Sequence, residues 1–257
     1  MKPIIRRLIF GLFIIIFSYS SYQIFTILNE QDVNQKKLAK IQEIYNNNKT
    51  ISETTDVLSS REARTSFQEL LDINSDIDGW IKIADTKIDY PILQSTDNEF
   101  YLTHNYKKET AATGSIFKDY RNTNEFIDKN TIIYGHYSDD QTMFTDLHQY
   151  LDKDFAQKHR VFQYDSLALS YDIEIFSVYQ TTTSEQYLLT AFSSNEAFQD
   201  YIQNAQNRSM YDFDTTVAAN DRILTLSTCD LEFAGKKGRF VIQGKLVKKA
   251  TLDQNQE

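Results

Sequence analysis

Eight short runs of apolar, β-branched and aromatic residues follow one another between Trp80 and Val247, separated by polar or glycine-containing segments. Runs of this length and composition are typical of β-strands, and so many of them predict a closed or nearly closed barrel. The predicted strands are Trp80–Ile83, Ile88–Leu93, Ser115–Lys118, Thr131–Gly135, Val161–Tyr164, Ala168–Val178, Ile223–Thr228 and Arg239–Val247.

Helices are predicted before and between these strands. A helix that begins at Ser59, with Glu62 completing a capping box, is expected to pack against the barrel. The apolar spacing of residues 143–151 predicts a short amphipathic helix, and Ser193 with Glu196 predicts the start of a longer one. The fold class is therefore mainly β: an eight-stranded barrel with N-terminal helices and one longer inserted helix.

An apolar segment near the N-terminus is long enough to cross a membrane. The 21 residues from Leu8 to Leu28 carry no charge, and a helix rising about 1.5 Å per residue crosses a hydrocarbon layer of roughly 30 Å in about 20 residues. Lys2, Arg6 and Arg7 precede the segment, and no basic residue follows it until Lys36. The positive-inside rule then predicts a single-pass protein of the cell membrane, with its N-terminus in the cytoplasm and the remainder outside.

A cleaved signal peptide is the alternative for this segment, with an apolar core from Leu8 to Phe17 and small residues at Ser18 and Ser20. An anchor is favoured because apolar residues continue to Leu28 and no Ala-x-Ala cleavage site is present. The polar residues that follow are loosely at helical spacing. We therefore divide the chain into a cytoplasmic start with its anchor, a helical stalk and a C-terminal domain, at residues 1–28, 29–58 and 59–257.

Charge and cysteine content exclude several classes of structure and partner. A net charge of −9 argues against a nucleic-acid partner, because phosphate binding needs clustered Lys and Arg. With one cysteine the chain forms no internal disulfide. A free thiol outside the cell is prone to oxidation, which favours a functional role for this cysteine. The scattered histidines lack the paired spacing of a zinc site, and no acidic loop has calcium spacing. Neither a metal nor another cofactor is expected.

The single cysteine, Cys229, ends one of the predicted strands, and a lone thiol at a strand end indicates a reactive group. Nine loop-like residues, including Gly235 and Gly238, lead from it to the strand that opens at Arg239. Strands joined by a short glycine-containing loop usually pair as a hairpin, so the cysteine and the arginine are expected to be close. His136 follows another short apolar run. Three strand ends would thus carry a thiol, an imidazole and a guanidinium.

These three groups together are suited to acyl transfer through a thioester. A cysteine attacks a carbonyl only as the thiolate, and a free thiol titrates near pH 8.5, so a neighbouring base or cation must activate it. His136 can take the proton and later protonate the departing amine. Arg239 stays charged and can stabilise the oxyanion or hold the substrate backbone.

The same residues carry a resemblance to the sortases, cysteine transpeptidases that attach proteins to the cell wall of Gram-positive bacteria. Residues 225–229 match the TLxTC signature, Arg239 lies where the essential arginine is expected, and residues 134–136 resemble the YGH segment that carries the histidine. The likeness is closest to class B, whose inserted helix matches the one predicted between Val178 and Ile223. It extends over roughly residues 72–248 and includes the segments at 78–81, 90–91, 114–117, 143–144 and 181–183.

This resemblance implies a sortase-type barrel at residues 59–257 that acts as the catalytic domain. Such enzymes cleave a C-terminal sorting signal, often of the NPxTx type in class B, and hold the product as a thioacyl enzyme. They then transfer it to an amino group of a peptidoglycan precursor. The partners implied are surface proteins that bear the signal. Residues that match the signal groove are Thr183, Tyr187, Leu188 and Ser227. The stretch 102–104 lacks the polar residue that the groove of some relatives carries.

Other readings are open for the same residues. Some class B relatives polymerise pilins, so that the acceptor is a pilin amine. A cysteine hydrolase would cut the peptide without transferring it, and a non-catalytic anchored module would only bind it. Taken singly, Cys229 could be a small buried hydrophobe, His136 a turn residue and Arg239 a surface charge.

Overall fold

The computed structural model describes these residues of the chain: 3–55, 64–123, 128–138, 140–229 and 231–249. They divide into two compact units, Met1–Glu43 and Ile44–Glu257. Helix α1 (Pro3–Thr55) forms the first unit, and its C-terminal turns belong to the second. By length and composition α1 could cross a membrane, and no residue of its most apolar stretch is buried.

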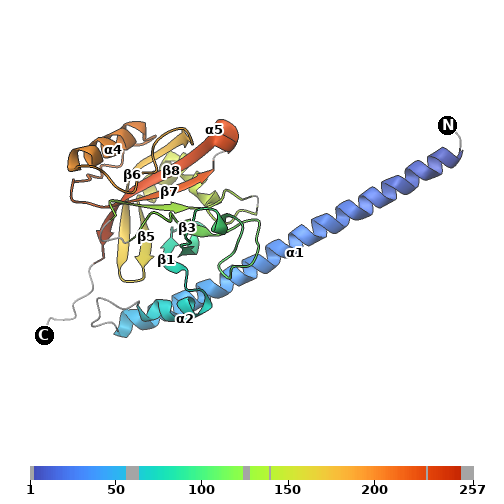
Figure 1. The fold of residues 1–257 in the computed structure, drawn as a ribbon, viewed down its shortest axis with the longest axis horizontal. Coiled ribbons are helices and arrows are strands. Elements are labelled where there is room, and N and C mark those ends of the chain that lie inside the picture. Colours follow the sequence, from blue (N-terminus) through green and yellow to red (C-terminus); the bar gives the residue numbers. More distant parts are fainter. Residues whose placement is uncertain (1–2, 56–63, 124–127, 139, 230, 250–257) are drawn as a thin grey trace. The chain divides into compact units, whose positions relative to one another are not determined.

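The second unit is built on eight strands, among the described residues, that close into a barrel (Figure 1). Around the barrel they follow the order β1-β2-β3-β4-β7-β8-β6-β5, and β5 pairs with β1. Neighbours are antiparallel except β2 with β3 and β4 with β7, which are parallel. The mainly β fold of eight strands is confirmed. The strands are β1 (Ile77–Lys82), β2 (Asp89–Leu93), β3 (Ile116–Lys118), β4 (Asn130–Tyr134), β5 (Val161–Ser166), β6 (Ser170–Thr182), β7 (Ile223–Cys229) and β8 (Gly238–Lys248).

Strand β6 differs most from its predicted bounds. It begins at Ser170 because the preceding residues form a turn in which the Ser166 backbone N–H donates to the Leu169 carbonyl at 2.9 Å. It continues past Val178 to Thr182 because β8 pairs with it to the end of both strands. The extra length brings the end of β6 beside the start of β8.

The helices after α1 differ from the predictions in number and in bounds. The N-cap of α4 is Ser194, whose side chain accepts from the Ala197 N–H at 3.2 Å, so the prediction of Ser193 was wrong by one residue. The capping box predicted at residues 59–62 lies outside the described residues. The helical segments after α1 are α2 (Thr65–Ile73), α3 (Lys153–Lys158), α4 (Asn195–Arg208), α5 (Leu231–Ala234) and 3-10 turns at Phe100–Leu102, Thr145–Leu151 and Gly235–Lys237.

The segment predicted as an amphipathic helix at 143–151 is a 3-10 turn that starts only at Thr145. Met143 has a positive φ of 54°, a left-handed conformation that a right-handed helix cannot contain. The unpredicted α3 follows, where the Asp152 side chain accepts from the Phe155 N–H at 2.8 Å. The nine residues expected as a loop after Cys229 likewise contain α5 and a 3-10 turn.

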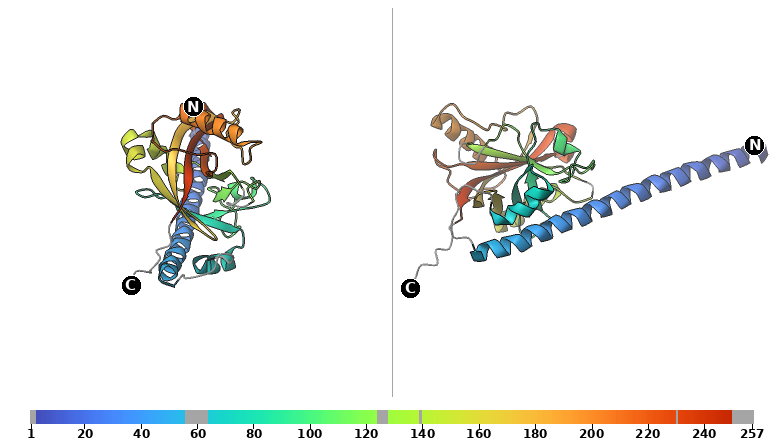
Figure 2. Two further views of the ribbon diagram at one scale, coloured as in Figure 1. Left: turned by 90° about the vertical axis from the view of Figure 1, so that its left-hand side faces the viewer. Right: turned by 60° about the horizontal axis from the view of Figure 1, so that its bottom comes forward.

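Helix α4 covers one side of the barrel and carries part of the core. Figure 2 shows α4, in orange, outside the strands in both views. Its buried residues, Phe198, Ile202 and Ala205, pack with Phe176 and Tyr179 of β6 in one apolar cluster. Burial of such side chains is worth about 1.5–3 kcal/mol each. Because β6 and α4 share this cluster, both ends of the connection between them are fixed.

The last turns of α1 pack on the barrel through Tyr45. Its ring stacks on Trp80 with 4.0 Å between centroids, and its hydroxyl donates to the buried Asp165 carboxylate. Burial raises the pKa of the Tyr45 hydroxyl, which therefore stays protonated and remains a donor. Lys49 and Arg64 lie 2.8 and 3.5 Å from the same carboxylate. One buried carboxylate thus ties the helix to β5.

Candidate active site

The parallel register of β4 and β7 aligns His136 with Cys229. Tyr134 is paired with Ser227, and the histidine and the cysteine each lie two residues further along. The Gly135 N–H donates to the Ser227 carbonyl at 3.3 Å, so the alignment continues beyond the last pair. Because neighbouring strands are about 4.8 Å apart, this pairing sets the two chain segments side by side.

The antiparallel register of β7 and β8 places Arg239 on the other side of the thiol. Cys229 and Arg239 are partners in the ladder, as the predicted hairpin requires. Directly opposed residues of an antiparallel pair direct their side chains to the same face of the sheet. The thiol therefore lies between the segment that carries the imidazole and the one that carries the guanidinium.

These three residues open into one cavity of about 300 Å³. The four residues predicted to line a substrate groove, Thr183, Tyr187, Leu188 and Ser227, line the same cavity. All seven sequence-predicted site residues are thus brought together, from β7, β8, the β6–α4 connection and the segment that follows β4. Other lining residues are Asn98, Leu102, Phe117, Tyr134, Gly135, Glu185 and Thr228.

The His136 side chain is oriented by the backbone. Its Nε2 lies 2.8 Å from the Leu102 carbonyl oxygen, and since that oxygen can only accept, Nε2 carries a proton. In the neutral ring Nδ1 is then the unprotonated nitrogen. Behind the ring, the Phe144 N–H donates to the His136 carbonyl at 3.0 Å. A Cβ on Gly135 would lie 2.4 Å from the Ile116 Cδ1, so only glycine allows this close packing.

Tyr187, from the β6–α4 connection, lines the cavity beside β7. Its buried hydroxyl shares a hydrogen bond of 3.0 Å with the Ser227 hydroxyl, two residues before the cysteine. Burial raises the pKa of Tyr187, and the nearby charge of Arg239 opposes that rise. The phenol is therefore neutral and close to the guanidinium.

Sequence reasoning missed one polar residue that lines the cavity, Asn98. Its side chain donates to the Asp119 carboxylate at 3.1 Å, and the same carboxylate accepts from the Tyr134 hydroxyl at 2.7 Å. Burial alone would raise the pKa of Asp119, but hydrogen bonds from Arg121 and Tyr134 outweigh it and hold that pKa below its ordinary value. Asn98 thus supplies a polar group in the cavity that the stretch 102–104 does not.

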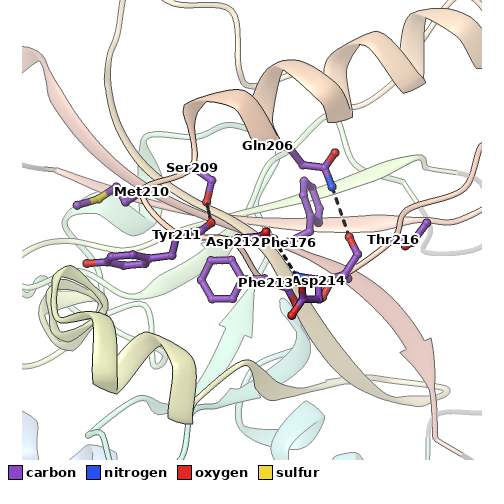
Figure 3. A pocket seen from close by; sticks show the side chains of 10 residues that line it. Phe176, Gln206, Ser209, Met210, Tyr211, Asp212, Phe213, Asp214 and Thr216 are labelled. Atoms are coloured by element: carbon purple, nitrogen blue, oxygen red, sulfur yellow. Dashed lines mark hydrogen bonds between the residues drawn. The ribbon is translucent and has the colours of Figure 1, made fainter.

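A larger hollow of about 570 Å³ lies below the C-terminal end of α4 and is shown in Figure 3. It is formed by residues 209–216 curling against Phe176 and Gln206. Polar groups of residues 209–216 form hydrogen bonds with one another; for example, the Ser209 hydroxyl donates to the Tyr211 carbonyl at 2.7 Å. Among the described residues that line it there is no cysteine, histidine or basic group. The cavity at Cys229 is therefore the candidate active site.

Comparison with known proteins identifies the family of the chain. Residues 81–247 match the sortase domain family. The chain is 50% identical over 234 residues to sortase B of Listeria monocytogenes, covering 91% of this chain and 93% of that protein. It is 34% identical over 245 residues to sortase B of Staphylococcus aureus, covering 95% of this chain and 96% of that protein.

Solved structures give the same result. Sortase B from B. anthracis in complex with AAEK1 is 42% identical with a TM-score of 0.76, covering 86% of this chain and all of that one. The Staphylococcus aureus sortase B–substrate complex is 33% identical with a TM-score of 0.79, covering 86% of this chain and 99% of that one. The chain described here therefore belongs to the sortase family of cysteine transpeptidases, as a class B sortase.

Proposed function

We propose that this sortase is anchored in the cell membrane and cleaves the C-terminal sorting signal of surface proteins. The signal is of the NPxTx type, the intermediate is a thioacyl enzyme on Cys229, and the acceptor is an amino group of the cell wall. The observation that carries the proposal is the position of the thiol, which strand register places between His136 and Arg239 in one cavity.

In the first half-reaction His136 takes the proton of the Cys229 thiol, and the resulting thiolate attacks the carbonyl carbon of the scissile peptide bond. A C–S bond forms, and the carbonyl electrons move to oxygen, beside the Arg239 guanidinium. Collapse of this tetrahedral species breaks the C–N bond, and the departing amine takes a proton from His136. Because His136 donates through Nε2 to the Leu102 carbonyl, Nδ1 is the nitrogen assigned to exchange that proton. The product is a thioester.

In the second half-reaction an amine of the acceptor attacks the thioester carbonyl. His136 accepts the proton of the incoming amine, a new amide forms, and the thiolate of Cys229 leaves. Water in place of the amine would give hydrolysis. A wall precursor or a pilin lysine would serve chemically, and the proposal takes the wall precursor because the polymerising alternative has no separate support in this cavity.

The N-terminal part of α1 is assigned as the membrane anchor. It is long and apolar enough to cross a bilayer. Lys2, Arg6 and Arg7 lie on its N-terminal side, which favours a cytoplasmic N-terminus and an extracellular catalytic domain. This location suits an enzyme whose substrates reach the outer face of the membrane.

The test is cleavage and ligation of a fluorescence-quenched NPxTx-type peptide by the full-length protein in detergent. We expect cleavage, amine-dependent ligation, and loss of both in Cys229→Ala and His136→Ala. Arg239→Ala should lose about 10²–10³ in kcat if the guanidinium stabilises the oxyanion. Cleavage without ligation to any amine would favour a hydrolase. Unchanged cleavage by Cys229→Ala would dismiss every scheme that uses the thiol.

A further inference from the structure

Three consecutive backbone carbonyls in the β6–α4 connection, those of residues 187–189, each accept a hydrogen bond from a side chain of a different part of the fold. Tyr201 of α4 donates to the first at 2.6 Å. Arg121, after β3, donates to the second at 3.2 Å, and Asn130 of β4 donates to the third at 2.8 Å. The first two of the three residues line the active-site cavity.

Two of these donors, Tyr201 and Asn130, are linked by hydrogen bonds to the same buried side chain. The Gln243 side-chain amide donates to the Tyr201 hydroxyl at 2.6 Å and to the Thr225 hydroxyl at 2.9 Å. Thr225 in turn donates to the Asn130 side-chain oxygen at 2.8 Å. Gln243, Thr225 and Asn130 are fully buried. The buried Gln243 amide therefore starts two chains of hydrogen bonds, one through Tyr201 and one through Thr225 and Asn130, and both chains end on the loop at residues 187–189.

The direction of donation in this network is determined by its ends. A carbonyl only accepts, so Tyr201 uses its single proton on the loop and must accept from Gln243. Asn130 turns its NH2 group to the loop, so its oxygen faces Thr225, which must also accept from Gln243. A single arrangement of protons therefore fits all of these bonds, while the buried Gln243 Oε1 has no hydrogen-bond partner among the described residues.

The third donor is fixed independently. Arg121 forms a two-point ion pair with the fully buried Asp119, through Nε at 2.9 Å and Nη2 at 2.7 Å. The same carboxylate accepts from Asn98 and Tyr134, which also line the cavity. Asp119 thus connects these two residues, through Arg121, to the Leu188 carbonyl.

We propose that Tyr201, Arg121 and Asn130 are positioning residues for sorting-signal recognition, an inference that rests on the proposed function of the cavity. The loop at 187–189 lies outside the strand ladders, so its conformation depends on these side chains. Holding it in the free enzyme removes an ordering cost that peptide binding would otherwise carry. None of the three residues lines the cavity, and they act through the backbone carbonyls of residues 187–189.

Tyr201→Phe is the direct test, because it removes one oxygen atom and disconnects one branch. Tyr150→Phe is the matched control, since the buried Tyr150 hydroxyl also donates to a backbone carbonyl, that of His159, at 2.9 Å, away from the cavity. Both are made in the full-length protein in detergent. Steady-state kinetics with the quenched NPxTx-type peptide, the rate at which iodoacetamide alkylates Cys229, and hydrogen–deuterium exchange are measured for each.

We expect Tyr201→Phe to raise KM about tenfold with kcat nearly unchanged, while iodoacetamide reacts at the wild-type rate. Amides of residues 183–192 should exchange faster in Tyr201→Phe and at the wild-type rate in Tyr150→Phe. Unchanged KM and unchanged exchange in Tyr201→Phe would overturn the inference. If the wild-type protein cleaves no peptide, the proposed function fails, while the exchange result still decides whether the network orders the loop.

Discussion

Cys229 and Arg239 are direct partners in the antiparallel ladder of β7 and β8. The thiol and the guanidinium are therefore positioned by the backbone hydrogen bonds of two long strands and not by the flexibility of a loop. The parallel pairing of β7 with β4 supplies the histidine in the same way. Because strand pairing fixes the positions of these side chains, small changes in side-chain shape at the site should affect activity.

Arg239→Lys should lower kcat about tenfold to a hundredfold, with a smaller change in KM. Lysine keeps the charge but replaces a planar fork of donors by a single ammonium, which cannot hold an oxyanion and the substrate backbone at once. Single-turnover acylation by the quenched peptide measures the affected step. Full kcat in Arg239→Lys would show that charge alone is sufficient.

Gly135→Ala should reduce stability by about 1–3 kcal/mol and also reduce activity per folded molecule. The new Cβ would meet the Ile116 Cδ1 at 2.4 Å and the Phe144 ring at 2.7 Å, next to His136. Gly244→Ala is the matched control, since its Cβ would meet a methyl of β6 at 2.4 Å, away from the cavity. Urea unfolding and kcat should separate the two, with kcat lowered only in Gly135→Ala.

The neutral His136 ring should carry its proton on Nε2. The Leu102 carbonyl 2.8 Å away accepts only from a protonated nitrogen. Long-range ¹H–¹⁵N correlation spectra, recorded at a pH where the imidazole is neutral, report the tautomer. A spectrum dominated by the Nδ1-protonated form would contradict the assignment of Nδ1 as the nitrogen that exchanges the catalytic proton.

Tyr45→Ala should destabilise the catalytic unit by about 3–5 kcal/mol, because it removes a buried aromatic ring and leaves a cavity. The ring stacks on Trp80 and its hydroxyl is bound by Asp165. Tyr120→Ala, at a side chain that is 52% exposed, should change stability by less than about 0.5 kcal/mol. Equal unfolding midpoints for the two variants would mean that α1 contributes nothing to the stability of the barrel.

Asp165→Asn should weaken the acid dependence of stability. Burial would raise the pKa of Asp165, but the charges of Lys49 and Arg64 outweigh burial and lower it below its unfolded value. Its contribution is therefore present above about pH 4 and is lost as the pH falls through the folded pKa. Urea unfolding between pH 2 and pH 7 should show a shallower loss in Asp165→Asn. An identical slope in both proteins would assign acid unfolding to other carboxylates.

Much of the barrel follows from sequence because each strand is a separate apolar run, and the pairing of Cys229 with Arg239 follows from one hairpin. The pairing of β4 with β7 is not local, so the partner of the thiol could be proposed from residue type and motif but not from chain geometry. Asn98 lies in an irregular segment and is placed by Asp119, twenty-one positions away. No periodicity marks such a residue.

Adjacent residues of the same type also limit how exactly a helix start can be predicted from sequence. Ser193 and Ser194 both precede α4, and only the first has a glutamate at the capping-box spacing, yet the hydroxyl of the second accepts the helix N–H. The predicted end of β6 at Val178 lies four residues before the observed end at Thr182. The pairing of Thr182 with Gly238 of β8 extends the strand to that residue.

Strands β4 and β7 are parallel neighbours, and the chain between them has to fold before they can meet. Until that crossover closes, the nascent polypeptide carries a sulfhydryl with no imidazole at its side. The thiol gains its neighbouring base only in the closed barrel, so completion of the fold and assembly of this pair are a single event.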